Sequence, residues 1–334
     1  MAPRVVVELE GLSREDWLAA RRTGIGSSDV PAICGLSRFG SPLSVYFDKL
    51  GEAEEEPENQ MMRMGRLLED PVAIMFEDAT GYRTSKPPAM YKHASIDHML
   101  ASPDRFVGEQ TTPEVLGLLE IKTGRNEVVW EAGPPLAVQL QLTHQMIVTE
   151  RSQGWIAVLL NGRDFDFWPM NLDDELAESI IQIEDEFWQR VLNRQEPPAD
   201  GHQATAEALK ARYRDVNPGA QVALDHLAAE IRGLGGVKAQ IAELETTKAK
   251  FENTIKQAMG DAEIGTFAGV PYVTWKAASA FDEERFAAEA PDLAAEFRKS
   301  GTDLTRLKEE RPDLAKQFRK DHAGPRKFLT KKGV

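Results

Sequence analysis

The sequence predicts a mixed α/β fold over residues 1–198, followed by a mostly helical region over residues 199–334 that contains one small β-hairpin. Short apolar runs bounded by turn residues, such as 117–123 and 155–160, have the length and composition of buried strands. Longer stretches with helical spacing of apolar residues lie between such runs. Beyond Pro198 the chain becomes rich in Ala, Glu and Lys, which favours helices. We therefore expect a mixed sheet flanked by helices, with a domain boundary after Pro198.

The first expected helix covers residues 11–22, with Ser13 as its N-cap and Arg21 in its last turn. The glycine turn GIGSSD follows, and a second helix is expected to begin near Ser28 and Asp29. Free N–H groups at a helix start, together with small hydroxyls, suit an anion. The residues alone support two interpretations equally. In the first, Arg21 and Ser28 bind an anion. In the second, Ser28 and Asp29 only cap a helix, and Arg21 complements a helix C-terminus.

An amphipathic helix is expected over residues 64–80, ending at Gly81, because apolar side chains recur there at helical spacing. Glu69 lies in the middle of this helix among apolar residues, and such an acid usually marks the edge of the polar face. Two strands joined by a turn are expected next, over residues 89–94 and 98–107.

Two acids and a base stand in the middle of the chain. Asp104 follows a proline where the strand over 98–107 ends or bends, and the strand over 117–123 carries Glu120 and Lys122. Side chains alternate along a strand, so Glu120 and Lys122 point to the same face. If the two segments pair, two carboxylates and one ammonium converge at one edge of a sheet.

This trio suits phosphodiester cleavage. Carboxylate oxygens are the ligands that Mg²⁺ prefers, and the ion keeps positions for water and phosphate. Bound Mg²⁺ makes water more nucleophilic and stabilises the charge that develops on the phosphate, and a nearby lysine can hold or deprotonate the attacking water. The competing interpretation is a strand whose end carries a solvated salt bridge. The spacing alone favours that competing interpretation, and the flanking segments change the balance.

The helix expected over residues 136–149 places Gln141 and Gln145 one turn apart on the same face. Amides suit hydrogen bonds to phosphate or to a metal-bound water, although two polar residues on a solvated face are an equally ordinary arrangement. The pair Asn161-Gly162 predicts a hairpin whose first strand is wholly apolar and therefore central.

The region beyond Pro198 carries weaker signals. Helices expected over 203–232 and 237–259 form a helical hairpin or a short coiled coil, and a β-hairpin is expected around Gly269. The segments PDLAAEFRK and PDLAKQFRK predict two similar short helices, each with proline and aspartate at its start. The basic tail GPRKFLTKKGV is expected to be solvated.

Amino-acid composition narrows the classes of protein to which this chain can belong. The apolar fraction of 42% is enough for a packed core, and the single cysteine, Cys34, excludes a disulfide framework and a four-cysteine metal site. The net charge is −14, from 54 acids against 40 bases, which argues against a general nucleic-acid coat protein but not against a nuclease with a local basic groove. No apolar run is long enough for a leader or a membrane span, so we expect no membrane association and a place in the cytosol.

Four blocks, taken together and in this order, give the chain a family resemblance. They are RRTGIGSSDVPAICGLSRFGSPLSVYFDKLG, MGRLLEDPVAIMFEDATGY, SPDRFV with LEIKT, and QLTHQMIVT with the following strand. The first 200 residues or so, which hold all four blocks, resemble the YqaJ-like viral recombinases, relatives of phage lambda exonuclease in the PD-(D/E)XK nuclease superfamily. The resemblance implies a restriction-endonuclease-like fold and a Mg²⁺-dependent DNA exonuclease, with Mn²⁺ as a substitute and two ions per site.

By the same resemblance the enzyme resects linear double-stranded DNA from the 5′ end and leaves a 3′ single strand for a phage annealing protein. A ring-like homo-oligomer such as a trimer is also implied. Metal ligands carried over from the family are Asp104, Glu120, the carbonyl of Ile121 and Glu69. Lys122 positions the attacking water, with Gln141 in support, and the terminal 5′-phosphate is held by Arg21, Ser28 and Ser102.

Two alternatives stay open. One is another PD-(D/E)XK nuclease that cuts internally in repair or defence. The other is a catalytically idle protein that binds DNA ends as a scaffold, against which the intact Asp104, Glu120 and Lys122 count.

Overall fold

The computed structural model of the chain describes residues 2–53, 59–125, 127–215, 217, 219–276, 281–297, 303–318 and 327–330. These residues form two compact units, Met1–Pro218 and Gly219–Val334. Sequence composition places the boundary earlier, after Pro198. The intervening helix α7 (Gln203–Arg212) falls within the first unit, because its Ala208 and Leu209 pack against the core of that unit.

The larger sheet of the first unit is mixed. In the part of the chain that the structure describes, its strands run in the order β3-β6-β7-β8-β9, with β7 and β8 parallel and the other neighbours antiparallel. The strands are β3 (Arg83–Ser85), β6 (Arg105–Gly108), β7 (Gly117–Gly124), β8 (Gln153–Leu160) and β9 (Asp164–Asn171). The apolar strand β8 lies between β7 and β9, and its hairpin turn holds Asn161 and Gly162 at positive φ, as expected.

A second, smaller sheet lies beside it in the first unit and has the order β1-β4-β5-β2. Its strands are β1 (Arg4–Glu8), β4 (Ala89–Lys92), β5 (Met99–Ala101) and β2 (Ile25–Gly26). The prediction of a single strand over residues 98–107 is wrong. The chain leaves the smaller sheet at Ala101 and enters the larger one at Arg105, because the two segments find different partners. Ser102 and Asp104 therefore lie where the chain crosses between sheets.

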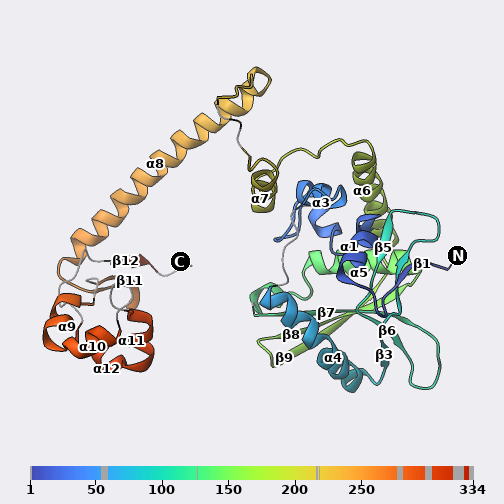
Figure 1. The fold of residues 1–334 in the computed structure, drawn as a ribbon, viewed down its shortest axis with the longest axis horizontal. Coiled ribbons are helices and arrows are strands. Elements are labelled where there is room, and N and C mark those ends of the chain that lie inside the picture. The colour runs from blue at the N-terminus through green and yellow to red at the C-terminus, as the bar shows by residue number, and fades with distance from the viewer. Residues whose placement is uncertain are drawn as a thin grey trace. The chain divides into compact units, whose positions relative to one another are not determined.

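Two helices cover opposite faces of the larger sheet (Figure 1). Helix α4 (Gln60–Thr80) packs Val72 and Phe76 against the face that carries Leu119, and it ends at Gly81 with φ 76°, as expected. Helix α5 (Leu136–Thr149) packs Leu142 against the other face, which carries Leu118. Alternation along β7 therefore turns Glu120 and Lys122 toward the side of α5. The mixed sheet flanked by helices that the sequence predicts is confirmed.

A second apolar core in the first unit is built in part by α2 (Val30–Ile33), α3 (Pro42–Lys49) and α6 (Asp174–Leu192). The unit also has α1 (Arg14–Arg22), none of whose residues is buried, and the short 3₁₀ helix η1 (Glu127–Trp130). Ser13 caps α1 by accepting a hydrogen bond from the Asp16 N–H, as expected. Asp29 makes no such bond at the start of α2. Its carboxylate is engaged elsewhere.

The second unit is mostly helical, with a small antiparallel sheet. Its elements are η2 (Asp225–Leu227), α8 (Ala228–Met259), β10 (Ile264–Phe267), β11 (Val270–Lys276), α9 (Glu283–Glu289), α10 (Pro291–Glu296), α11 (Leu304–Glu310), α12 (Pro312–Gln317) and β12 (Lys327–Thr330). The hairpin around Gly269 is confirmed. None of the described helices is long and apolar enough to cross a membrane.

Two expectations for this region are corrected and one is confirmed. The helical hairpin is wrong, because α8 runs unbroken through Gly233 and Gly236, whose cost of about 1 kcal/mol each does not outweigh the good helix formers around them. The two similar short helices expected at the repeated segments are confirmed as α10 and α12, which begin at Pro291 and Pro312 and carry an aspartate in the first turn. Residues Lys327–Thr330 of the basic tail pair with β11, and the rest of the tail lies outside the described residues.

Candidate functional site

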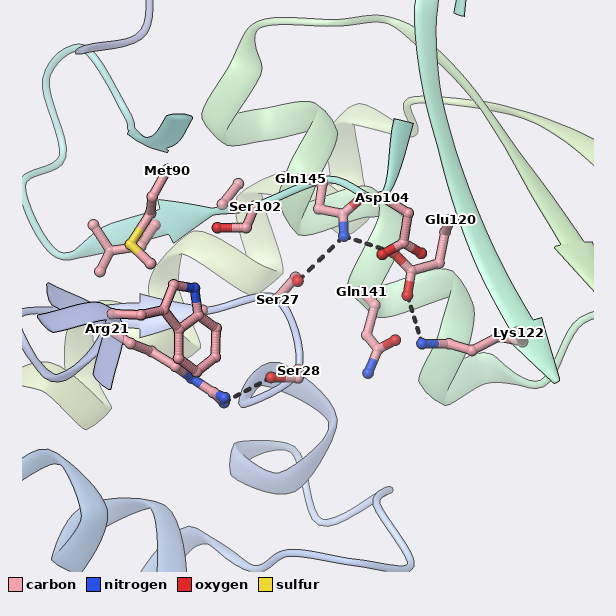
Figure 2. Close-up of a pocket in the computed structure, with 14 residues that line it drawn as sticks. Arg21, Ser27, Ser28, Met90, Ser102, Asp104, Glu120, Lys122, Gln141 and Gln145 are labelled. Atoms are coloured by element: carbon pink, nitrogen blue, oxygen red, sulfur yellow. Dashed lines mark hydrogen bonds and ion pairs between the residues drawn. The ribbon is translucent and has the colours of Figure 1, made fainter. Parts of the chain in front are cut away.

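One cavity in the first unit collects most of the residues that the sequence singles out (Figure 2). Its lining includes Arg21, Ser28, Ser102, Asp104, Glu120, Lys122 and Gln141. These side chains come from α1, the turn before α2, the crossing between β5 and β6, strand β7 and helix α5. Of the predicted side chains, Glu69 does not line the cavity.

The two carboxylates and the ammonium converge at one end of the cavity because β6 pairs with β7. That pairing sets Arg105 opposite Leu119, so Asp104 lies beside the middle of β7. Oδ2 of Asp104 accepts a hydrogen bond of 2.7 Å from the N–H of Ile121, and Nζ of Lys122 lies 2.5 Å from Oε1 of Glu120. The two segments that carry Asp104 and Glu120 therefore do pair, as the predicted convergence requires.

The charges at this end are closely coupled. Burial raises the pKa of Asp104 well above its usual value, and the neighbouring carboxylate of Glu120 raises it further, so that Lys122 and the Ile121 N–H offset the increase only in part. Burial lowers the pKa of Lys122, but the carboxylates of Glu120 and Asp104 more than offset that effect and the pKa is raised. Lys122 is therefore an ammonium at neutral pH in the metal-free protein.

The donor set fits a divalent cation. The pocket holds two crowded carboxylates, and the amide oxygens Oε1 of Gln141 and Gln145 are buried there without a hydrogen-bond donor. Buried acceptors without donors are costly, and a cation with its bound water satisfies such oxygens. Among the described residues no group of three or more His, Cys, Asp and Glu side chains gathers as a metal cage. Divalent cations such as Mg²⁺ can be held by one or two carboxylates together with bound water, and the pocket offers two carboxylates.

Gln145 is a site residue that the sequence analysis underrates in favour of Gln141. The residue is 1% exposed, and its Nε2 donates to Oε2 of Glu120 at 2.7 Å and to Oγ of Ser27 at 3.2 Å (Figure 2). Gln145 thus connects the acidic end of the cavity to the turn that carries Ser27 and Ser28. The signal was present in the sequence, since Gln141 and Gln145 share a helix face, but it does not tell which amide meets the carboxylate.

The other end of the cavity carries a guanidinium. Nη2 of Arg21 donates to Oγ of Ser28 at 2.7 Å and to Oδ1 of Asp29 at 2.5 Å, and the guanidinium lies over the ring of Trp17, 5.5 Å from its centroid. Asp29 accepts from Arg21 instead of capping α2, so the simple capping interpretation is wrong for Asp29. A guanidinium and two hydroxyls, those of Ser28 and Ser102, face one cavity.

Comparison with known proteins identifies the family. A family model described as the YqaJ-like viral recombinase domain matches residues 16–152. The chain is 33% identical over 306 residues to the protein named "Uncharacterized protein YqaJ" of Bacillus subtilis (strain 168), a match that covers 88% of this chain and 94% of the relative. The chain belongs to the YqaJ-like viral recombinase family. The family predicted from the four sequence blocks is thereby confirmed.

Solved structures give a more distant likeness to this YqaJ-family chain. The alkaline exonuclease LHK-Exo of Laribacter hongkongensis is 21% identical, with a TM-score of 0.45, over 54% of this chain and 94% of that chain. The same exonuclease in complex with dAMP is 22% identical, with a TM-score of 0.45, over 60% of this chain and 98% of that chain. This likeness is too remote to assign an activity.

Glu69 occupies a different place in this YqaJ-family site. It projects from α4, which covers the face of the sheet opposite to α5, and its side chain is 33% exposed. Oε2 of Glu69 lies 3.6 Å from Nη1 of Arg105. Its charge still acts on Asp104 and Lys122, where it raises both pKa values. The role of Glu69 as a metal ligand stays a prediction.

Proposed function

We propose that this chain is a metal-dependent deoxyribonuclease, an exonuclease of phage-type recombination that resects linear double-stranded DNA from the 5′ end. One observation carries the proposal. A single cavity has two crowded carboxylates with a lysine at one end and a guanidinium with serine hydroxyls at the other. The first end suits the scissile phosphate and a metal ion, and the second suits a terminal phosphate.

In the proposed mechanism, Asp104, Glu120 and the Ile121 carbonyl would hold Mg²⁺, with Mn²⁺ as a substitute and two ions per site. When bound, the metal would supply Lewis-acid activation of water and stabilise charge on the phosphate. Lys122 would donate a hydrogen bond from Nζ that orients the attacking water. Gln141 accepts from a bound water through its free Oε1, and Glu69 supports the site through its charge.

The phosphate end sets which DNA end enters. Arg21 offers charge-assisted hydrogen bonds to a terminal 5′-phosphate, with Ser28 and Ser102 as further donors. Cleavage from that end would leave a 3′ single strand, the substrate of an annealing protein. A ring-like homo-oligomer and action in the cytosol of a bacterium or infected host complete the proposal.

The decisive experiment uses a linear duplex with 5′-phosphates and a fluorophore at one 3′ end, incubated with and without Mg²⁺. We expect progressively shorter labelled strands with the wild type, none in EDTA, and none with Lys122→Ala. Lys210→Ala is the matched control, because Lys210 is an exposed lysine on α7 outside the cavity.

Two results would overturn the proposal. Cutting of a covalently closed circle at a comparable rate would identify an endonuclease. Tight binding of DNA ends without cleavage in any divalent metal would identify a scaffold protein.

A further inference from the structure

A buried lysine lies behind the phosphate end of the cavity. Lys49 is the last residue of α3, and its side chain is 0% exposed. Its Nζ lies 2.6 Å from Oδ2 of Asp29 and donates to the backbone oxygen of Arg21 at 3.3 Å. Burying an ammonium is costly unless it is paired, so this position requires a compensating anion.

Asp29 is that anion, and it is shared. Its Oδ1 accepts from Nη2 of Arg21 at 2.5 Å, and its Oδ2 accepts from Lys49 and from the N–H of Gly26 at 2.9 Å. The pKa of Asp29 is far below its usual value, because Arg21 and Lys49 outweigh the opposing effect of burial. Arg21, Asp29 and Lys49 are thus joined by ion pairs into one chain of charges, in which Asp29 is the middle member.

The net charge of these three side chains determines how they act on a ligand. Arg21 and Lys49 contribute two positive charges and Asp29 one negative charge, so the group keeps a net charge of +1. Asp48 lies 3.7 Å from Nζ of Lys49 and 3.8 Å from Nε of Arg22, and this further acid and base together leave the sum at +1. Of the three side chains in the chain of charges, the one that lines the cavity is Arg21. Without Lys49, the Arg21–Asp29 pair would be neutral as seen from the cavity.

We propose that Lys49 acts through Asp29 as a positioning residue that leaves the Arg21 guanidinium both oriented and uncompensated for the phosphate of a 5′ DNA end. The inference rests on the proposed function and extends it to end selection. Asp29 fixes the guanidinium against Ser28, and Lys49 neutralises Asp29 so that the orientation does not cancel the charge. Neither Lys49 nor Asp29 lines the cavity, so neither touches the substrate.

The test compares duplexes that differ only in a 5′-phosphate or a 5′-hydroxyl. Cleavage rates in Mg²⁺ and dissociation constants in EDTA are measured for the wild type, Lys49→Met, and the double variant Asp29→Asn with Lys49→Met. We expect the phosphate preference of Lys49→Met to fall by about tenfold, with its rate on 5′-hydroxyl ends unchanged. The double variant removes one charge of each sign, restores the net +1, and should regain most of the preference.

The double variant also guards against misfolding, because it leaves no buried carboxylate without its lysine. Thermal unfolding of each variant is followed in parallel, with Lys210→Met as the exposed-lysine control. A purely structural role for Lys49 predicts that the double variant is no better than the single one, and that result would overturn the inference. Unchanged preference in Lys49→Met would do the same. A wild type that neither cleaves nor distinguishes the two ends would instead overturn the proposed function.

Discussion

Gln145 donates a hydrogen bond of 2.7 Å to Oε2 of Glu120, a residue that is 4% exposed. Lys122 engages the other oxygen, Oε1, of the same carboxylate. Glu120 is thus held from both sides, by its own strand and by helix α5. A carboxylate whose orientation is fixed before a metal arrives loses less entropy on binding it, which is the usual role of such supporting groups.

Replacing Gln145 with leucine should therefore weaken both the site and the fold. We expect cleavage to fall about 10- to 100-fold, as is typical when a group supporting a metal ligand is removed. The free energy of unfolding should fall by about 1–3 kcal/mol, because an oxygen of buried Glu120 loses its donor. Initial rates and urea denaturation measure the two effects. Gln182→Leu, at an exposed glutamine of α6, is the control, and equal behaviour of both variants would contradict the prediction.

Substitutions of Glu69 and Glu120 should differ in how they change the cleavage rate and its dependence on Mg²⁺ concentration. Glu69→Gln removes a charge on the α4 side of the sheet. We expect the cleavage rate to fall about 10- to 100-fold, as when a group that supports a metal ligand is removed. Glu120→Gln and Asp104→Asn change oxygens that line the cavity and should cost more than that. Titration of the rate with Mg²⁺ distinguishes the cases. A larger loss for Glu69→Gln than for Glu120→Gln would make Glu69 a direct ligand.

The buried pair His144 and Glu184 should make stability depend on pH. Nδ1 of His144 lies 2.7 Å from Oε1 of Glu184, and Nε2 lies 2.7 Å from the Leu100 carbonyl oxygen. Burial lowers the pKa of His144, but Glu184 and this carbonyl outweigh it, so the pKa is raised. The folded state then binds more protons than the unfolded state above the ordinary histidine pKa of about 6.5. This stabilisation is complete below that pH and is lost as the pH rises through the raised pKa.

Urea denaturation between about pH 6 and pH 9 tests this dependence. We expect the free energy of unfolding of the wild type to fall as the pH rises, and we expect a shallower slope for Glu184→Gln, which lacks the carboxylate. Parallel slopes in the two proteins would show that His144 is neutral in the fold.

The second unit should depend on an aromatic core built by its repeat. Phe286, Phe297, Leu307 and Phe318 are buried together, with the rings of Phe286 and Phe318 5.0 Å apart. The guanidinium of Arg285 stacks on Phe318, and that of Arg306 stacks on Phe297, so each half covers a ring of the other. Phe318→Ala should cost about 3–5 kcal/mol in the stability of this unit, measured by denaturation or limited proteolysis. Phe267→Ala, at a ring 64% exposed, should cost far less.

Much of the first unit follows from local sequence pattern. The helix ending at Gly81, the turn at Asn161-Gly162 and the shared face of Glu120 and Lys122 were all predictable. Each depends on the backbone preference of a few residues or on the period of a strand, which neighbouring residues determine by themselves. For the same reason the two short helices that begin at Pro291 and Pro312 were predictable from the proline and aspartate at their start.

Local pattern therefore predicts most elements of the first unit, the family and most of the candidate site residues. Three relationships appear only in the folded chain: Gln145 holds Glu120, Glu69 projects from the helix on the opposite face of the sheet, and Lys49 lies behind Arg21. They could not be predicted because they join side chains from different elements, as the contact between Ser27 and Gln145 also does. Their distances are set by how helices and sheets pack against one another, and no local preference of the chain records that packing.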